Sequence, residues 1–134
     1  MNKQITSMFL IFSHELTQEQ IDDAKKTLGV EKFIKLPGDI QEKWSNIPPN
    51  IELSSDFFKD LTNFLLANKT KVNYCLVQGD FGATHYIVNW CFKNGFTPIY
   101  STTERKAVEH KNEDGSLSLI KVFKHVMFRR YINE

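Results

Sequence analysis

Strand-like segments of this chain run straight into polar turns, and helix-like patterns then follow. The segments are the mostly apolar Thr6–Phe12 and Val72–Val77 and the short, mixed Glu31–Leu36. A near-continuous apolar run of this length is typical of a strand buried on both faces, and parallel strands need crossover connections that are usually helices. The alternation of strand and helix therefore predicts a parallel sheet covered by helices.

The helices between these strands carry recognisable start and stop signals. Thr17 and Gln20 form a capping box, and Gly29 is placed to end the helix that they open. A less regular stretch, 39–50, holds a short helix that Pro48 and Pro49 stop. Further helices are predicted from Ser54 onward and from Ala83-Thr84 to Gly95.

The last third of the chain changes character. Phe96–Tyr100 predicts a fourth strand that opens into the polar segment 101–106. Ala107–Lys111 and Leu117–Tyr131 flank an Asp-Gly pair, which is a hairpin signal. On the second of these segments Lys121, His125 and Arg129 are expected to share a face. We therefore expect residues 1–134 to form one small α/β Rossmann-like domain, a mainly parallel sheet flanked by helices with an antiparallel β-hairpin appended.

Composition excludes several classes of protein. The 134 residues hold 17 Lys+Arg and 16 Asp+Glu, a net charge of +1 that argues against a general binder of long nucleic acid. The longest apolar run, 8–12, is too short to span a bilayer, and the N-terminus lacks the apolar region of a secretion signal. Cys75 and Cys91 are expected to be buried and reduced. These features predict a cytoplasmic protein without a structural metal or a membrane segment.

Polar clusters follow three of the predicted strands, at 13–14, 78–84 and 101–106. Ligands of open α/β sheets bind outside the carboxyl ends of the strands, so these clusters are expected to converge on one crevice. His14 is either a polar loop residue or an acid–base group whose ordinary pKa of ~6.5 suits proton transfer near neutrality. Ser13 lies beside it.

The segment Gln78-Gly79-Asp80-Phe81-Gly82-Ala83-Thr84 suits a close approach of backbone to ligand. Its glycines permit a tight turn, and the helix that follows has N–H groups that attract anions. The alternative is a plain strand-to-helix turn. The Asp80 carboxylate argues against a bare phosphate cradle unless it engages a ribose hydroxyl or an arginine.

Hydroxyl and basic side chains complete the candidate set. Ser101, Thr102 and Thr103 can bind phosphate or ribose, or can simply cap a turn. Arg105 and Lys106 follow them, either as functional cations or as a solvated face. The hairpin carries Lys124, His125 and Arg129, either as a positive wall toward an anionic ligand or as charges that protect an edge strand.

Five blocks in order along the chain resemble a small CRISPR-associated family that accompanies type III systems and is grouped with the ring nucleases. The blocks are Phe12–Thr17, Trp44–Pro49, Val77–Thr84, Pro98–Arg105 and Val122–Arg129. The hairpin is also similar to that of a sister ring-nuclease family, in which an arginine is usual between Val and Phe. Met127 stands at that place here, so this chain lacks the arginine at that position.

The resemblance implies a function. Type III effectors synthesise cyclic oligoadenylates, and ring nucleases linearise them to end the response; cyclic tetra-adenylate is the usual substrate. Such proteins are typically Rossmann-like homodimers related to CARF domains. Without a metal or other cofactor, a ribose 2′-hydroxyl attacks the adjacent phosphate and leaves a 2′,3′-cyclic phosphate.

On this interpretation His14 is the general base or acid, and Arg105 or Lys106 stabilises the developing charge. Residues 78–84, Ser13, the three hydroxyls at 101–103 and the basic hairpin residues bind the ring. Two alternatives stay open: a protein that sequesters the ring without cleaving it, and an interaction module whose hairpin edge docks a protein partner.

Overall fold

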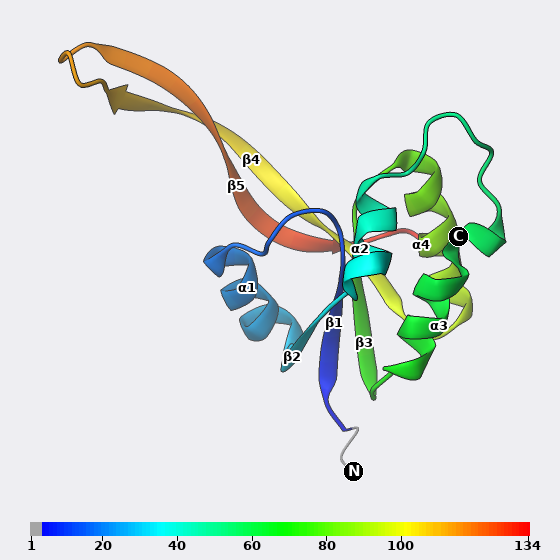
Figure 1. Ribbon diagram of the computed structural model, residues 1–134. Coiled ribbons are helices and arrows are strands. Elements are labelled where there is room, and N and C mark those ends of the chain that lie inside the picture. The colour runs from blue at the N-terminus through cyan, green and yellow to red at the C-terminus, as the bar shows by residue number, and fades with distance from the viewer. Residues whose placement is uncertain (1–3) are drawn as a thin grey trace.

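The computed structural model describes residues 4–134 and contains one five-stranded sheet with the strand order β2-β1-β3-β4-β5. The pairs β1–β2, β1–β3 and β3–β4 are parallel, and β4–β5 is antiparallel (Figure 1). The elements are β1 (Thr6–Ile11), α1 (Gln18–Leu28), β2 (Lys32–Lys35), α2 (Gly38–Ser45), the 3-10 helix η1 (Ser55–Phe58), α3 (Lys59–Ala67), β3 (Val72–Val77), α4 (Phe81–Lys93), β4 (Thr97–Lys111) and β5 (Leu117–Arg130). The predicted α/β class, with a mostly parallel sheet and a C-terminal antiparallel pair, is confirmed.

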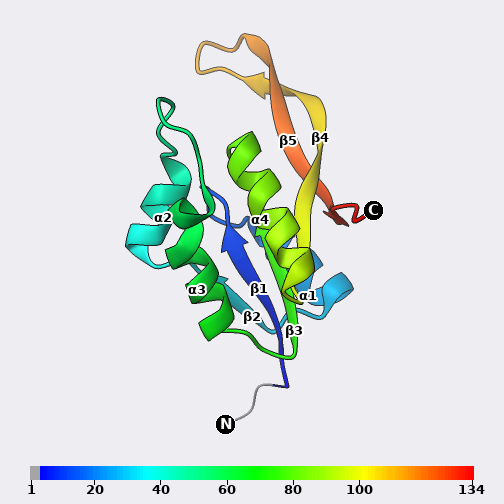
Figure 2. The same cartoon turned by 90° about the vertical axis from the view of Figure 1, so that its right-hand side faces the viewer.

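Helices cover both faces of the parallel part of the sheet (Figures 1 and 2). Alternate residues of β1 explain this: Phe9 and Ile11 pack toward α2, α3 and α4, whereas Met8 and Leu10 pack toward α1. Both sets are buried, which is why the strand is an apolar run rather than an alternating pattern. Among the described residues, no helix is both long and apolar enough to cross a membrane.

The start and the end of α1 follow the sequence prediction. The Thr17 hydroxyl accepts from the Gln20 N–H at 3.2 Å, and the Gln20 side chain accepts from the Thr17 N–H at 2.9 Å. Gly29 ends the helix in the left-handed region, at φ 69°.

The two cysteines, Cys75 and Cys91, are buried and free, also as predicted.

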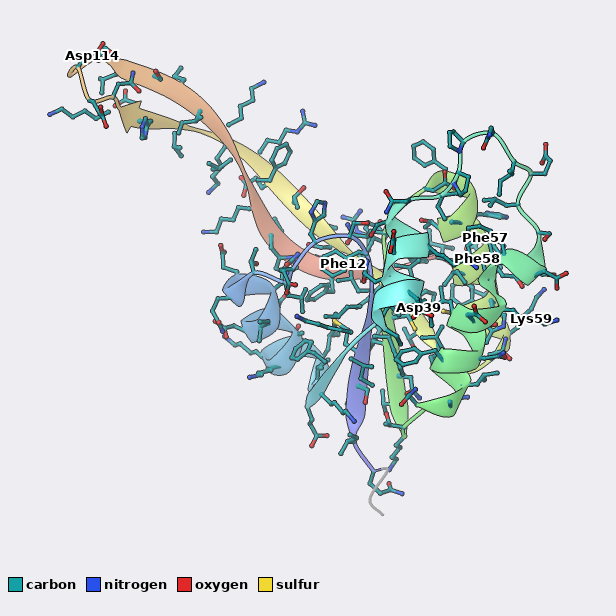
Figure 3. All side chains as sticks on the ribbon, in the orientation of Figure 1. Phe12, Asp39, Phe57, Phe58, Lys59 and Asp114 are labelled. Carbon is teal, nitrogen blue, oxygen red and sulfur yellow. The ribbon has the colours of Figure 1, made fainter. Side chains whose placement is uncertain are left out.

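The prediction that β4 ends near Tyr100 was wrong. The strand continues to Lys111 and pairs with β5 along its length, so 101–106 is strand rather than an open polar segment. No glycine or proline interrupts residues 101–106, and each of them has a partner opposite in β5. The resulting β-ribbon projects away from the body of the protein, and Asp114 lies at its far tip (Figure 3).

A β-bulge near the base of the ribbon reverses the faces of β5. Thr103 pairs with His125 but Thr102 pairs with Met127, so Val126 is the extra residue. The His125 and Phe128 rings consequently contact each other, with centroids 4.6 Å apart, while Arg129 lies over Tyr100 on the opposite face. The expectation that His125 and Arg129 share a face was therefore wrong, because the bulge shifts the side-chain alternation by one residue.

Candidate functional site

A polar groove lies at the carboxyl edge of the sheet, where the strand order places β1 beside β3. The chain leaves β1 for β2 on one side and returns to β3 on the other, which is the position where open α/β sheets bind ligands. We call it the relay groove, of about 370 Å³. It is lined by Phe12, His14, Glu15, Thr17, Glu19, Gln20, Gln78, Ser101, Thr103, Phe123 and His125.

Three side chains from distant parts of the chain form a continuous hydrogen-bonded series behind this groove. The Ser101 Oγ lies 2.6 Å from His125 Nδ1, and His125 Nε2 lies 2.7 Å from Asp23 Oδ2. The side chain of His125 is 6% exposed and that of Asp23 is 21% exposed. A nearly buried imidazole held between a hydroxyl and a carboxylate is the arrangement in which hydroxyl protons are transferred in enzymes.

The partners of the imidazole define where its protons lie. A carboxylate only accepts hydrogen bonds, so His125 Nε2 carries a proton and donates a hydrogen bond to Asp23 Oδ2. With neutral imidazole, Nδ1 then accepts from the Ser101 hydroxyl. The Ser101 oxygen in turn accepts from the Gln20 side-chain amide at 3.3 Å. The Ser101 proton thus points at a base, and its oxygen stays at the groove.

Each member of the series is positioned by its own element. The bulge at Val126 turns His125 toward α1. Gln20 and Asp23 are three residues apart, so they lie on one side of α1. The Ser101 N–H donates to the Gln78 side-chain oxygen at 2.8 Å, which joins the end of β3 to β4. The Thr27 hydroxyl lies 2.7 Å from the Asp23 carbonyl and 3.0 Å from the second Asp23 carboxylate oxygen, so its single proton is shared between the two acceptors.

The predicted convergence of the three polar clusters is therefore realised for part of each cluster. His14, Gln78 and Ser101 line the relay groove together, and Thr103 joins them. Thr102 does not, because alternate strand residues face opposite sides of the ribbon, and its hydroxyl is bonded to the backbone of Met127. Ser13 lines a neighbouring depression with Lys35, and His14 borders both.

The segment 78–84 is committed largely to structure. Asp80 caps α4 by accepting from the Ala83 N–H at 2.9 Å, and the Ala83 side chain is buried in the core. The Trp44 indole donates to the Gln78 carbonyl at 3.1 Å and lies against Gly79. Thus the local structure that the sequence left as an alternative, a tight strand-to-helix turn, accounts for most of these residues.

A second groove lies on the α4 side of β4, and we call it the aromatic groove. Gln78 lines both grooves, so the two adjoin at the end of β3. The aromatic groove is lined by Gln78, Gly79, Phe81, Thr84, Tyr100 and Tyr131.

The expectation that Arg105 and Lys106 form a pair of loop cations beside the hydroxyls is not met. They are adjacent strand residues, so their side chains leave opposite faces of the ribbon. Arg105 lies over the Phe123 ring at 5.1 Å, and Lys106 pairs with Glu104 at 3.8 Å. Neither lines the relay groove.

The other hairpin cations engage different partners. Lys124 pairs with Glu104 and Arg129 with Tyr100, so both leave the ribbon on the face opposite His125. The Lys124 amine lies 4.0 Å from Glu19 of α1, an exposed and weak pair, whereas Arg129 donates to the Tyr100 hydroxyl at 3.2 Å. The hairpin therefore does not present one continuous positive wall.

Asp23 and Gln20 were missed by sequence reasoning. Both belong to a helix whose apolar stripe runs through Ile21, Ala24 and Leu28, and a polar residue beside such a stripe usually faces solvent. The available signal was their position at the border of the stripe. β5 covers that border, and its His125, which contacts Asp23, lies 102 residues further along the chain.

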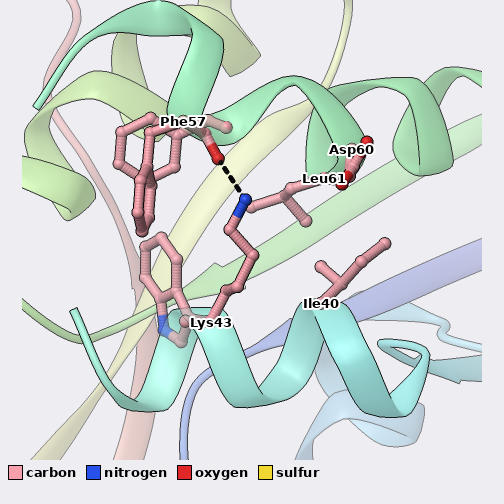
Figure 4. Close-up of a pocket in the computed structure, with 7 residues that line it drawn as sticks. Ile40, Lys43, Phe57, Asp60 and Leu61 are labelled. Atoms are coloured by element: carbon pink, nitrogen blue, oxygen red, sulfur yellow. Dashed lines mark hydrogen bonds between the residues drawn. The ribbon is translucent and has the colours of Figure 1, made fainter. Parts of the chain in front are cut away.

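An apolar crevice between α2 and the η1–α3 segment carries no comparable chemistry (Figure 4). It is lined mainly by Ile40, Phe57 and Leu61. Lys43 donates to the Phe57 carbonyl at 3.1 Å and lies over its ring, which ties the two helices together. This crevice is a packing contact.

The polar groups of the relay groove lie within a region shared with known relatives. The family described as "Uncharacterized protein MJ1673 family" matches residues 6–129. The chain belongs to this family. The protein of Methanocaldococcus jannaschii described as "Uncharacterized protein MJ1673" is 47% identical over 124 residues, which cover 92% of this chain and 95% of that protein. No solved structure matches the chain.

The range shared with the MJ1673 family contains the whole hydrogen-bonded series from Asp23 to His125. Within residues 4–134, no cluster of three or more His, Cys, Asp or Glu side chains is arranged to hold a metal ion. The groove and the series behind it carry hydroxyl, imidazole, carboxylate and amide groups.

Proposed function

We propose that this protein is a ring nuclease that binds and linearises a cyclic oligoadenylate, most simply cyclic tetra-adenylate, and so ends type III CRISPR signalling in the cytoplasm. The observation that carries the proposal is the Ser101–His125–Asp23 series at the edge of the relay groove. The ring supplies its own nucleophile, a ribose 2′-hydroxyl, so the protein has to accept that proton and hold the phosphate in line.

The reaction proceeds by intramolecular displacement at phosphorus. The 2′-oxygen bonds to the adjacent phosphorus while its proton passes to Ser101 Oγ and the Ser101 proton passes to His125 Nδ1. The bond from phosphorus to the 5′-oxygen breaks, and that oxygen takes a proton. The products are a 2′,3′-cyclic phosphate and a free 5′-hydroxyl, so no water is consumed and every proton is accounted for.

Asp23 and His14 have separate roles in this scheme. Asp23 stabilises the imidazolium that forms when His125 accepts the proton, as a carboxylate does in hydrolytic triads. His14 is exposed at the same groove and donates the proton to the leaving 5′-oxygen. A base and an acid on one groove satisfy the two proton transfers that the displacement requires.

We further propose a homodimeric, CARF-related Rossmann-like fold. The strand order and the groove between β1 and β3 support the fold relation. The ribbon supports the dimer: Leu117, Leu119 and Phe123 are 62%, 74% and 63% exposed, and a two-stranded ribbon is marginally stable without a surface to pack on. A second copy offers an isologous surface that matches the two-fold symmetry of a cyclic tetra-adenylate.

The proposed function is tested by incubating purified protein with cyclic tetra-adenylate in EDTA and identifying the products by mass spectrometry. Linear oligoadenylates with 2′,3′-cyclic phosphate ends are expected. Ser101→Ala and His125→Gln should each slow cleavage by about a hundredfold or more, and circular dichroism checks that each variant is folded. Intact ring recovered from protein that binds it would make the protein a sponge, and intact ring without binding would leave only the interaction module.

A further inference from the structure

The aromatic groove holds a large apolar side chain that has no structural use. Phe81, the first residue of α4, is 95% exposed. Burying a phenylalanine side chain is worth about 1.5–3 kcal/mol, so full exposure forgoes a stabilisation that most of the other phenylalanines of this chain obtain. An exposed aromatic ring at the rim of a groove points to a ligand or a partner.

The groove beside Phe81 combines aromatic rings with a cation. The Tyr100 and Tyr131 rings lie 4.8 Å apart, and the Arg129 guanidinium lies 5.7 Å from the Tyr100 ring centroid. An adjoining depression is lined by the same two tyrosines and Arg129, and also by Arg130. Exposed aromatic faces beside guanidinium groups are the surface that stacks nucleobases and contacts their phosphates.

A hydrogen-bonding group is also left unused within this groove. The Thr84 hydroxyl oxygen is buried, and within the described residues it has no hydrogen-bond partner. Thr84 lines the groove together with Gln78, a residue that lines both grooves. A buried polar atom without a partner is costly, and a ligand that reaches it recovers that cost.

We propose that the aromatic groove is the adenine subsite: one base of the cyclic oligoadenylate stacks on Phe81 while the adjoining phosphate lies toward Arg129. The inference rests on the proposed function, because it takes the ring to be bound in the relay groove. Gln78 connects the two grooves, so a single ring spans them. The mixture of rings, cations and amide favours a nucleotide over an apolar protein surface.

The test uses cyclic tetra-adenylate in which one adenine is replaced by 2-aminopurine, whose fluorescence is quenched by stacking. The variants are Phe81→Ala and Phe81→Trp, with Leu66→Ala as a control, because Leu66 of α3 is 48% exposed, lies outside the ribbon and lines neither groove. Phe81→Ala is expected to weaken binding by about tenfold or more and to lose the quenching, whereas Phe81→Trp and Leu66→Ala keep both.

The outcomes separate this proposal from the proposed function. If wild-type protein neither binds nor cleaves the ring, the proposed function is wrong and the subsite falls with it. If wild-type protein binds and cleaves but Phe81→Ala binds and quenches equally well, only the subsite is wrong. If Phe81→Ala instead converts a dimer into a monomer in sedimentation while quenching per bound ring is unchanged, Phe81 is an interface residue and the subsite is overturned.

Discussion

Ser101 and His125 are 24 residues apart in sequence, yet their side chains lie 2.6 Å apart on adjacent strands of the ribbon. The contact depends on the bulge at Val126, because regular pairing would direct either His125 or Phe128 to the other face. Bulges often re-aim a side chain beside an active site. Here the bulge aims an imidazole at a hydroxyl on one side and at the Asp23 carboxylate on the other.

Removing the Asp23 charge is predicted to slow ring cleavage without unfolding the protein. In Asp23→Asn the amide keeps the size of the side chain but no longer stabilises a charged His125, so we expect turnover to fall by about a hundredfold. Single-turnover cleavage of cyclic tetra-adenylate measures this. Asp22→Asn is the matched control, because Asp22 is the preceding residue of α1 and its carboxylate accepts from the exposed Gln18 side chain, away from the series. Equal rates for the two variants would remove Asp23 from the mechanism.

The two glycines of segment 78–84 are predicted to differ in what they contribute. A Cβ on Gly79 would lie 2.9 Å from the Trp44 indole nitrogen, which is itself bonded to the Gln78 carbonyl. Gly79→Ala should therefore cost about 1–3 kcal/mol of unfolding free energy. A Cβ on Gly82 meets its nearest atom at 3.5 Å, an ordinary contact, so Gly82→Ala should be within about 0.5 kcal/mol of wild type.

Urea unfolding followed by tryptophan fluorescence compares these two variants. A Gly79→Ala protein as stable as Gly82→Ala would show that the Trp44 contact relaxes freely. In that case the tight approach at Gly79 would have to be explained by a ligand instead of by packing.

The parts of this fold that the sequence predicted are those encoded by local pattern. The apolar run Val72–Val77 and the capping box at Thr17 need only neighbours within a few residues to be recognised, and both are present. The length of β4 was underestimated because its outer half has a polar sequence and is held by pairing with β5, which a local pattern does not reveal.

The candidate site was predicted less completely for the same reason. The rule that polar groups gather at the carboxyl ends of parallel strands brought His14, Gln78 and Ser101 to one groove. The position of His125 depends on one inserted residue in β5, and that of Asp23 on how α1 packs against the ribbon. Arg105 and Lys106 were placed beside the hydroxyls only because they are near in sequence.

The capping box is predicted to be a substantial part of the stability of α1. Thr17→Ala removes the acceptor for the Gln20 N–H and should cost about 1 kcal/mol. Thr17→Ser keeps the hydroxyl and should restore most of that loss. Thermal unfolding of the three proteins by circular dichroism measures the difference, and equal midpoints for Thr17→Ala and Thr17→Ser would contradict it.

The cysteines are predicted to be inert in the folded protein. Burial raises the pKa of the Cys75 thiol well above its ordinary value, and the neighbouring Cys91 raises it further. Since the thiolate is the reactive form of Cys75 and both thiols are buried, a thiol reagent should modify neither residue at neutral pH until the chain unfolds. Mass spectrometry after timed labelling with and without urea tests this. Rapid native labelling would mean that the sheet opens on the α4 side.

Stability at high pH is predicted to depend on Tyr131. Its hydroxyl donates to the Val77 carbonyl at 2.6 Å, and burial, with a smaller effect from Tyr100, raises its pKa above the ordinary value of 10.0. The folded protein holds the Tyr131 proton more tightly than the unfolded chain does. The contribution of this group to the free energy of unfolding is therefore complete below pH 10.0 and is lost as the pH rises through the folded-state pKa. Tyr131→Phe should cost about 1 kcal/mol at neutral pH. Urea midpoints of both proteins, measured from neutral pH upward, should then converge, and curves that stay parallel would contradict the raised pKa.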